Sequence, residues 1–322
     1  MSNALYLAWS GGLGRQVAAL AQAATTQFRG AGADGGGPSP AMLALVAAGS
    51  CVLVVWIIRC IALPGRLKLR NTPGRCNSLT MAHLVLVAVV MLFASNAAVG
   101  LLHKLLPENP TTQPGQAATQ AASSPDEGLL GVQVGIAAGT LRALAWLAAS
   151  LVVAAQTFRH GLFSGLGLSL RHWLCDLARA IIGYLAVLPV CVGLLLLLTY
   201  LFYIYDITPT IHPILKHLND LSPPWRILAV IGAVVLAPLA EEVFFRGLVQ
   251  SFFRRALHSP RLAILLASAI FAAVHYNQPQ AVPSLFVLAL ALGYNYERTG
   301  RLISPILIHA IFNAVNLATW KG

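Results

Sequence analysis

Long apolar segments, following one another along most of the chain, are the feature that most limits what this sequence can fold into. A helix needs about 20 mainly apolar residues to cross the hydrocarbon core of a bilayer. Only 10% of the residues are charged and 57% are hydrophobic, whereas soluble domains carry about 25% charged residues. So few charges cannot cover the surface of a soluble protein of this size. The pattern therefore predicts an all-α, polytopic bundle of transmembrane helices.

Hydropathy and helix-breaking residues divide this bundle into about eight spans. We expect an integral, multi-pass membrane protein whose immediate partner is membrane lipid. Residues 1–40 are interrupted by glycines and charges, and they are predicted to form a flexible or weakly amphipathic N-terminal segment. Residues 41–205 are predicted to form a region of four helices, and residues 225–320 a separate C-terminal region. The predicted spans are 42–63, 81–102, 129–157, 180–205, 225–253, 262–276, 282–296 and 302–320.

The excess of positive charge has a distinctive distribution. The formal net charge is +11, which in other proteins can indicate binding to nucleic acid. Here the lysines and arginines gather in short loops after the first, third, fifth and seventh spans, as the positive-inside rule describes. This pattern places those loops in the cytoplasm and both termini on the other side, and it argues against a nucleic-acid partner. The sequence does not define an oligomeric state.

Two adjacent carboxylates interrupt the fifth span, in the segment Glu241-Glu242-Val243-Phe244-Phe245-Arg246-Gly247. A charged side chain in the middle of a membrane helix costs about 3 kcal/mol even on lenient scales, so such residues mark functional sites. Glu242 and Arg246 are four residues apart and share one helix face, where they can pair. Glu241 points about 100° away around the helix and lacks that partner. Glu242 and Arg246 are therefore predicted to be a structural pair, and Glu241 a general base.

Three further polar residues lie in the short spans that follow. His275 comes at the end of the sixth predicted helix, and by itself it is typical of a membrane interface. His309 and Asn313 are four residues apart on the eighth helix and share one face. Such a pair can line a cavity and donate hydrogen bonds to an oxyanion, or it can simply connect two helices. We predict that the C-terminal half contains a polar cavity lined by these residues.

The three elements together resemble one family. Glu-Glu-x-x-x-Arg at 241–246, Phe-x-x-x-His at 271–275 and His-x-x-x-Asn at 309–313 are similar to the motifs of the CAAX protease and bacteriocin-processing family of intramembrane endopeptidases. The resemblance covers residues 225–317, and no motif position departs from the pattern. It implies that 225–320 is a catalytic transmembrane region. The helices before it carry no motif of the family.

The resemblance also implies a role for each residue. Glu241 would activate a water molecule with help from His275, and His309 and Asn313 would stabilise the oxyanion. Glu242 and Arg246 would orient the site. The substrate would be a membrane-associated peptide or protein, with or without a lipid: some members remove a C-terminal tripeptide from prenylated proteins, and others process or resist bacteriocin peptides.

The need for a metal is left open by the sequence. Two histidines and one glutamate, here His275, His309 and Glu241, form a plausible set of zinc ligands. The zincin motif His-Glu-x-x-His is absent, however, and a metal-free mechanism driven by glutamate is the one we favour. No cofactor is assigned.

Two functions from other classes remain as alternatives. In a catalytically silent membrane scaffold or immunity protein, the motif residues would serve only packing. In a proton-coupled transporter, Glu241, Glu242 and His275 would form a proton relay. Transporters of this size often carry an internal repeat, and none is visible between the two halves of the chain.

Overall fold

The computed structural model of the protein describes residues 40–62, 69, 76–105, 125–210 and 213–319. These residues form an α-helical bundle, and the only β-type pairing among them is an isolated bridge between Asn77 and Phe158. Five helices, at 40–59, 81–98, 129–157, 170–204 and 223–257, are long and apolar enough to cross a membrane. The predicted class, an all-α polytopic membrane protein, is confirmed.

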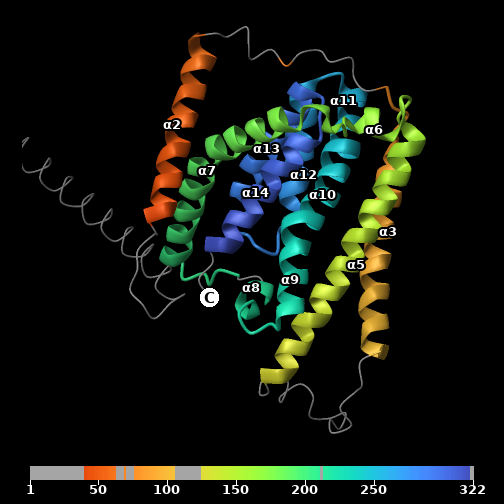
Figure 1. The fold of residues 1–322 in the computed structure, drawn as a ribbon, viewed down its shortest axis with the longest axis vertical. Coiled ribbons are helices and arrows are strands. Elements are labelled where there is room, and N and C mark those ends of the chain that lie inside the picture. Colours follow the sequence, from red (N-terminus) through yellow and green to blue (C-terminus); the bar gives the residue numbers. More distant parts are fainter. Residues whose placement is uncertain (1–39, 63–68, 70–75, 106–124, 211–212, 320–322) are drawn as a thin grey trace, which may run out of the picture.

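Eight long helical segments follow one another through the described residues, in agreement with the predicted number (Figure 1). One of them, from residue 223 to residue 257, is a single rod built from five elements. The full order is α2 (Pro40–Ala62), α3 (Met81–Leu105), α5 (Pro125–Thr157), α6 (Gly161–Leu166), η2 (Leu170–His172), α7 (Trp173–Ile204), α8 (Pro213–His217), α9 (Pro223–Ile231), η3 (Gly232–Leu236), α10 (Ala237–Glu242), η4 (Val243–Gln250), α11 (Ser251–Leu257), α12 (Pro260–Ala273), α13 (Val282–Thr299) and α14 (Ile303–Thr319).

Two helix boundaries differ from the prediction in ways that matter for the site. α7 begins at Trp173, seven residues before the predicted start, because Asp176 is buried and paired within its first turn rather than excluded from the helix. α12 ends at Ala273, so His275 lies in the turn after this helix and not within it. After Ala273, the backbone N–H groups of His275 and Tyr276 donate to the carbonyls three residues earlier, as in a turn.

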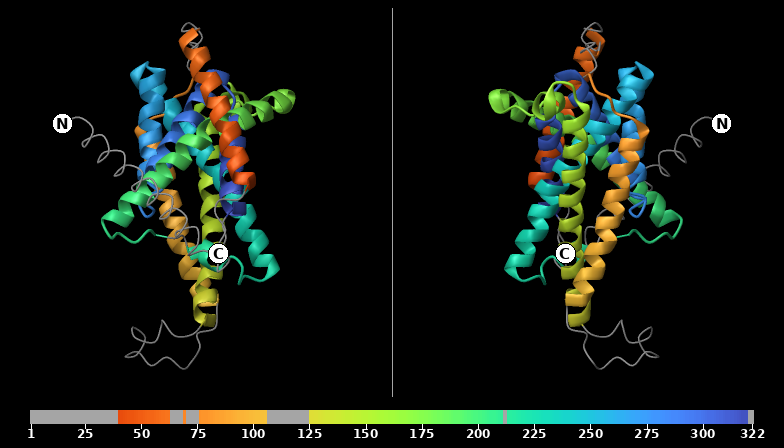
Figure 2. Two further views of the ribbon diagram at one scale, coloured as in Figure 1. Left: turned by 90° about the vertical axis from the view of Figure 1, so that its left-hand side faces the viewer. Right: turned by 90° about the vertical axis from the view of Figure 1, so that its right-hand side faces the viewer.

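Described segments that flank the basic loops lie together at one end of the bundle (Figures 1 and 2). The backbone N–H of Arg159 donates to the carbonyl of Cys76 over 3.0 Å. The guanidinium of Arg255 donates to the carbonyls of Asn77, over 3.1 Å, and of Leu79. Arg301 donates to the carbonyl of Ser169. Chain segments on the flanks of four different loops are therefore held at the same end, as the alternation of basic loops predicts.

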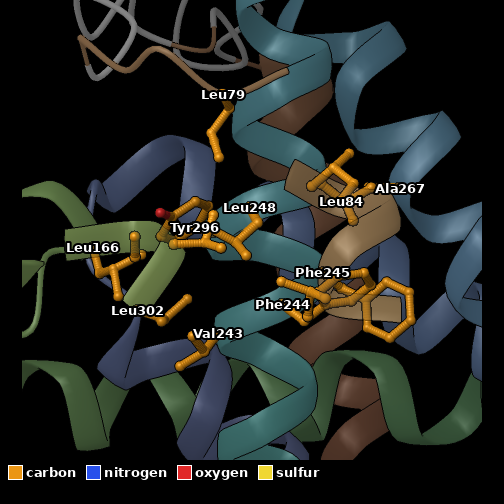
Figure 3. Packing of buried hydrophobic residues seen from close by; sticks show 14 of the residues in the cluster. Leu79, Leu84, Leu166, Val243, Phe244, Phe245, Leu248, Ala267, Tyr296 and Leu302 are labelled. Carbon is orange, nitrogen blue, oxygen red and sulfur yellow. The ribbon is translucent and has the colours of Figure 1, made fainter. Parts of the chain in front are cut away.

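The best-buried part of the bundle surrounds η4. Every residue from Glu242 to Ser251 is buried, and Figure 3 shows Val243, Phe244, Phe245 and Leu248 of this segment packed among side chains from other helices. α5 contacts η4 on one side, while α12 and α13 contact it from others. The N-terminal helices thus form part of the wall around the C-terminal motifs.

The outer helices present apolar side chains to their surroundings. On α2, the side chains from Val54 to Ile58 are all more than 40% exposed, and on α3 Phe93 is 72% exposed. Soluble proteins rarely expose such continuous apolar surfaces to water, whereas the lipid of a bilayer solvates them. The chain is therefore an integral, multi-pass membrane protein.

Some sequence predictions fall outside the described residues. They are the flexible or amphipathic character of residues 1–40, the basic loop from Arg66 to Arg75 apart from residue 69, and most of the polar loop from 107 to 127. The division into regions at 41–205 and 225–320 stays a prediction.

Candidate active site

The adjacent glutamates lie on the long rod, at the point where its helical geometry changes. α10, which ends in Glu241 and Glu242, is flanked by two π-helical segments, η3 and η4. π-helical segments inside α-helices are rare and occur frequently at functional sites, because the wider turn leaves backbone groups without their usual partners. Nothing in the residue pattern predicts these two segments.

Glu242 is fully buried and joins two side chains from different helices. Its Oε2 lies 3.1 Å from Nε of Arg246, and both side chains are 0% exposed. Its Oε1 lies 2.9 Å from Nδ1 of His309, on α14. Pairing with Arg246 is the arrangement that the spacing of four residues suggests, whereas the contact with His309 is not visible from spacing. Glu242 therefore ties the rod to α14 as well as neutralising Arg246.

Glu241 points away from this pair but stays close to the same histidine. Its Oε2 is 3.8 Å from Nε2 of His309, and its side chain is 17% exposed. That oxygen is buried and accepts no hydrogen bond from the described residues. Of the two glutamates, Glu241 is thus the one with a partly exposed side chain, and its contact with His309 is the longer one.

His309 is held between the two carboxylates. The contact to Glu242 through Nδ1 orients the ring so that Nε2 faces Glu241. When Nδ1 carries a proton and donates to Glu242, Nε2 of the neutral ring can accept a proton and Nε2 of the cationic ring can donate one. The two ring nitrogens thus face one carboxylate each, Nδ1 at hydrogen-bond distance from Glu242 and Nε2 at 3.8 Å from Glu241.

Phe271 lies at the centre of this group. In the sequence, this residue is notable only as the first residue of the Phe-x-x-x-His motif. Its ring centroid is 4.9 Å from that of His275 and 5.7 Å from that of His309. The guanidinium carbon of Arg246 lies 4.9 Å from the same centroid, within the range of a cation–π contact. The ring is fully buried. Phe271 therefore packs against three of the predicted site residues at once.

His275 and Asn313 occupy the margins of the group. Nδ1 of His275 is 2.7 Å from the carbonyl oxygen of Phe271, and the half-buried ring reaches the cluster through its contact with Phe271. Nδ2 of Asn313 donates to the carbonyl of Ala233 over 2.9 Å. Since Ala233 lies in η3, Asn313 links α14 to the first π-helical segment and satisfies one of its carbonyls.

The structure thus brings Glu241, Glu242, Arg246 and His309 into direct contact, with His275 and Asn313 attached through Phe271 and Ala233. Among the described residues, no group of three or more His, Cys, Asp or Glu side chains has the arrangement of a metal site. The set named above for zinc, Glu241, His275 and His309, does not form such a group.

Comparisons with known proteins point to the same part of the chain. Residues 223–315 match the family model described as type II CAAX prenyl endopeptidase Rce1-like. An uncharacterized 24.3 kDa protein of Escherichia coli is 35% identical over 97 residues, which are 29% of this chain and 45% of that protein. The uncharacterized protein YpbD of Bacillus subtilis is 34% identical over 90 residues, 27% of this chain and 42% of its own length.

The chain therefore spans less than half the length of the curated relatives that it matches. No solved structure matches it. The region covered by the family begins with α9, contains all three motifs and ends within α14, so that it includes every site residue described above. Residues 223–315 are thus similar to the Rce1-like family of type II CAAX prenyl endopeptidases, in agreement with the resemblance of the motifs.

Proposed function

We propose that the protein is an intramembrane endopeptidase that cleaves a peptide bond of a membrane-associated substrate, with Glu241 as its general base. The observation that carries this proposal is the pair formed by Glu241 and His309. A partly accessible carboxylate faces a ring nitrogen over 3.8 Å, and a second carboxylate, Glu242, fixes the other ring nitrogen over 2.9 Å. Such a base with its own oriented partner suits the activation of water.

The proposed reaction uses each group at a defined step. Glu241 takes a proton from water, and the oxygen of that water forms a bond with the carbonyl carbon of the scissile peptide. The negative charge that develops on the carbonyl oxygen is stabilised by N–H donors, for which His309 and the second amide hydrogen of Asn313 are the candidates. The carbon–nitrogen bond then breaks as the proton passes from Glu241 to the leaving nitrogen.

The remaining residues position these groups. Arg246 compensates the charge of Glu242, Glu242 orients His309, and Phe271 packs against His275, His309 and Arg246. A substrate with a prenylated C-terminal CAAX sequence is proposed first, because the matched family carries that name. Peptides without a lipid remain the second class to test.

Two measurements on the full chain test the proposal. The first follows cleavage of a quenched fluorescent, farnesylated CAAX peptide by protein in liposomes, and the second compares the membrane proteomes of cells that express wild type or Glu241→Gln. Glu241→Gln keeps the size of the side chain but removes its basic oxygen, so we expect cleavage to be abolished. Cys175→Ser, at an exposed position far from the motifs in sequence, serves as the control and should cleave normally.

The two assays have different consequences. Cleavage of cellular proteins, but not of the CAAX peptide, would replace the prenylated substrate by another membrane peptide. Equal proteomes and equal peptide turnover for wild type and Glu241→Gln would reject the protease and favour the scaffold function.

A further inference from the structure

A row of polar contacts continues from Arg246 toward the basic end of the bundle, along the line where the rod meets α13. Nη2 of Arg246 lies 3.4 Å from the carbonyl oxygen of Ala289. Nε2 of Gln250 donates to the carbonyl of Gly293 over 3.0 Å. Nε of Arg254 donates to Oε1 of Glu297 over 2.7 Å. None of these contacts takes part in the proposed reaction.

The residues that form this row are four apart on the rod and also four apart on α13. On an α-helix, residues four apart drift by about 40° around the axis, so a row of three would turn by about 80° and leave the contact line. On the rod, the step from 246 to 250 lies inside the π-helical segment η4. Its wider turn offsets part of that drift and keeps 246, 250 and 254 facing α13.

Gln250 connects the members of the row. The same Nε2 that donates to Gly293 lies 3.4 Å from Oε2 of Glu297, and the residue is 1% exposed. A Cβ added at Gly293 would lie 2.8 Å from Oε1 of Gln250 and 3.1 Å from Ile264. Only glycine at position 293 therefore lets the amide of Gln250 approach so closely.

Arg246 belongs both to this row and to the site. Its Nε contacts Glu242 and its Nη2 contacts Ala289 on α13, while the side chain is completely buried. The lateral position of α13 thus sets where the guanidinium lies. Because Glu242 bonds both Arg246 and His309, a shift of α13 would be passed on to the ring that faces Glu241.

We propose that Gln250 and Glu297 are positioning residues, which hold α13 in register with the rod so that Arg246 and Glu242 keep His309 aimed at Glu241. The proposal rests on the proposed function for its catalytic consequence. Its structural consequence, the orientation of His309, is independent of any substrate.

The test compares Gln250→Leu, which removes the amide at nearly constant size, with Gly293→Ala, which pushes the intact amide away. We expect each variant to lower kcat for the substrate of the wild type by about 10- to 100-fold with KM unchanged, because a small displacement of catalytic groups slows the chemical step. The double variant should be no slower than the slower single variant, since both act on the same contact.

Ser284→Ala is the matched control. Ser284 also lies on α13 and also makes a buried bond to another helix, from its hydroxyl to the carbonyl of Cys191 over 3.0 Å, but it has no link to Arg246 through the row. It should leave kcat unchanged. Unchanged kcat in Gln250→Leu would overturn the proposal, and so would losses of activity that are matched by Ser284→Ala or that follow only a lower temperature of unfolding.

A spectroscopic measurement covers the case in which no cleavage is found. Nitrogen-15 NMR of histidine-labelled protein in liposomes reports the hydrogen bond at Nδ1 of His309, with the signal assigned by its loss in His309→Gln. We expect Gln250→Leu and Gly293→Ala to shift or broaden this signal and Ser284→Ala to leave it in place. An unaltered signal in both test variants would overturn the proposal, whatever the outcome for the protease.

Discussion

At the scale of single residues, the site depends on burial more than on the number of charges. Glu242 and Arg246 are both 0% exposed, whereas the side chain of Glu241 is 17% exposed. A buried charge that loses its partner keeps the full cost of desolvation. Loss of the partner of Glu242 should therefore destabilise the protein more than a change at Glu241, although the two glutamates are adjacent in sequence.

Arg246→Ala is expected to destabilise the protein far more than Glu241→Gln. It leaves the carboxylate of Glu242 buried without its cation, at a cost of about 3–5 kcal/mol, while Glu241→Gln changes an atom that accepts no hydrogen bond from the described residues. Thermal unfolding in detergent measures the difference. Arg246→Lys should fall between them, because it keeps the charge but not the planar group that contacts Phe271 and Ala289. Equal stability of Arg246→Ala and Glu241→Gln would contradict the pairing.

At the scale of the elements, the start of α7 is attached to the turn between α13 and α14. Nε of Arg301 lies 2.9 Å from both carboxylate oxygens of Asp176, and Nη2 lies 2.6 Å from Oδ2. Asp176 is completely buried and also pairs with Arg179 over 3.2 Å. Because α14 starts two residues after Arg301, this contact sets the position of the helix that carries His309 and Asn313.

Asp176→Asn should lower both the unfolding temperature and the activity, since the guanidinium of Arg301 loses its charged, buried acceptor. The hydrogen bonds that Arg301 donates to the carboxylate of Asp176 raise the pKa of Arg301 above its ordinary value. A cation with a raised pKa contributes its stabilisation fully below the pKa of the unfolded chain and loses it only as pH rises through the folded value. The difference in stability between wild type and Asp176→Asn should therefore stay constant from pH 7 to about pH 10. Unfolding at several pH values tests this expectation, and a difference that shrinks across that range would contradict it.

At the scale of the whole molecule, the alternation of basic loops and the three-dimensional arrangement agree. Cys76 is exposed and lies beside Arg159, and Asn77 is bonded to Arg255 near the end of the rod. These segments therefore lie on the same side of the membrane as one another. By the positive-inside rule, we expect that side to be the cytoplasm.

Thiol labelling tests this topology in a background that lacks the other four cysteines. Cys76 and a cysteine introduced by Ser259→Cys should both react with an impermeant maleimide in inverted vesicles and stay unlabelled in intact cells. A cysteine introduced by Asp220→Cys, after α8 at the opposite end, is the control for the other side. Reaction of Cys76 and Ser259→Cys from different sides would contradict the arrangement of the helices, and reaction of both in intact cells would reverse the orientation.

Helix type and approximate order were predictable from the sequence, because both follow from local chemistry. Apolar runs of sufficient length can only be helices in lipid, so α2, α3 and α13 begin within two residues of their predicted starts. The pair Glu242–Arg246 was predictable for the same reason, since a spacing of four places both side chains on one helix face. The position of Glu241 on a different helix face from this pair followed from the same geometry.

The contacts between helices were decided only by tertiary structure. The family resemblance implied His275 as the partner of Glu241, whereas packing places His309 between both glutamates and leaves His275 beside Phe271. Packing also places Nδ2 of Asn313 where it donates a hydrogen bond to the carbonyl of Ala233. The two π-helical segments, which no residue pattern predicts, also appear only in the tertiary structure. A periodic pattern specifies which face of a helix a residue occupies. The partner on the neighbouring helix depends on how far each helix slides and rotates against the next, and only the packing of the whole bundle determines that.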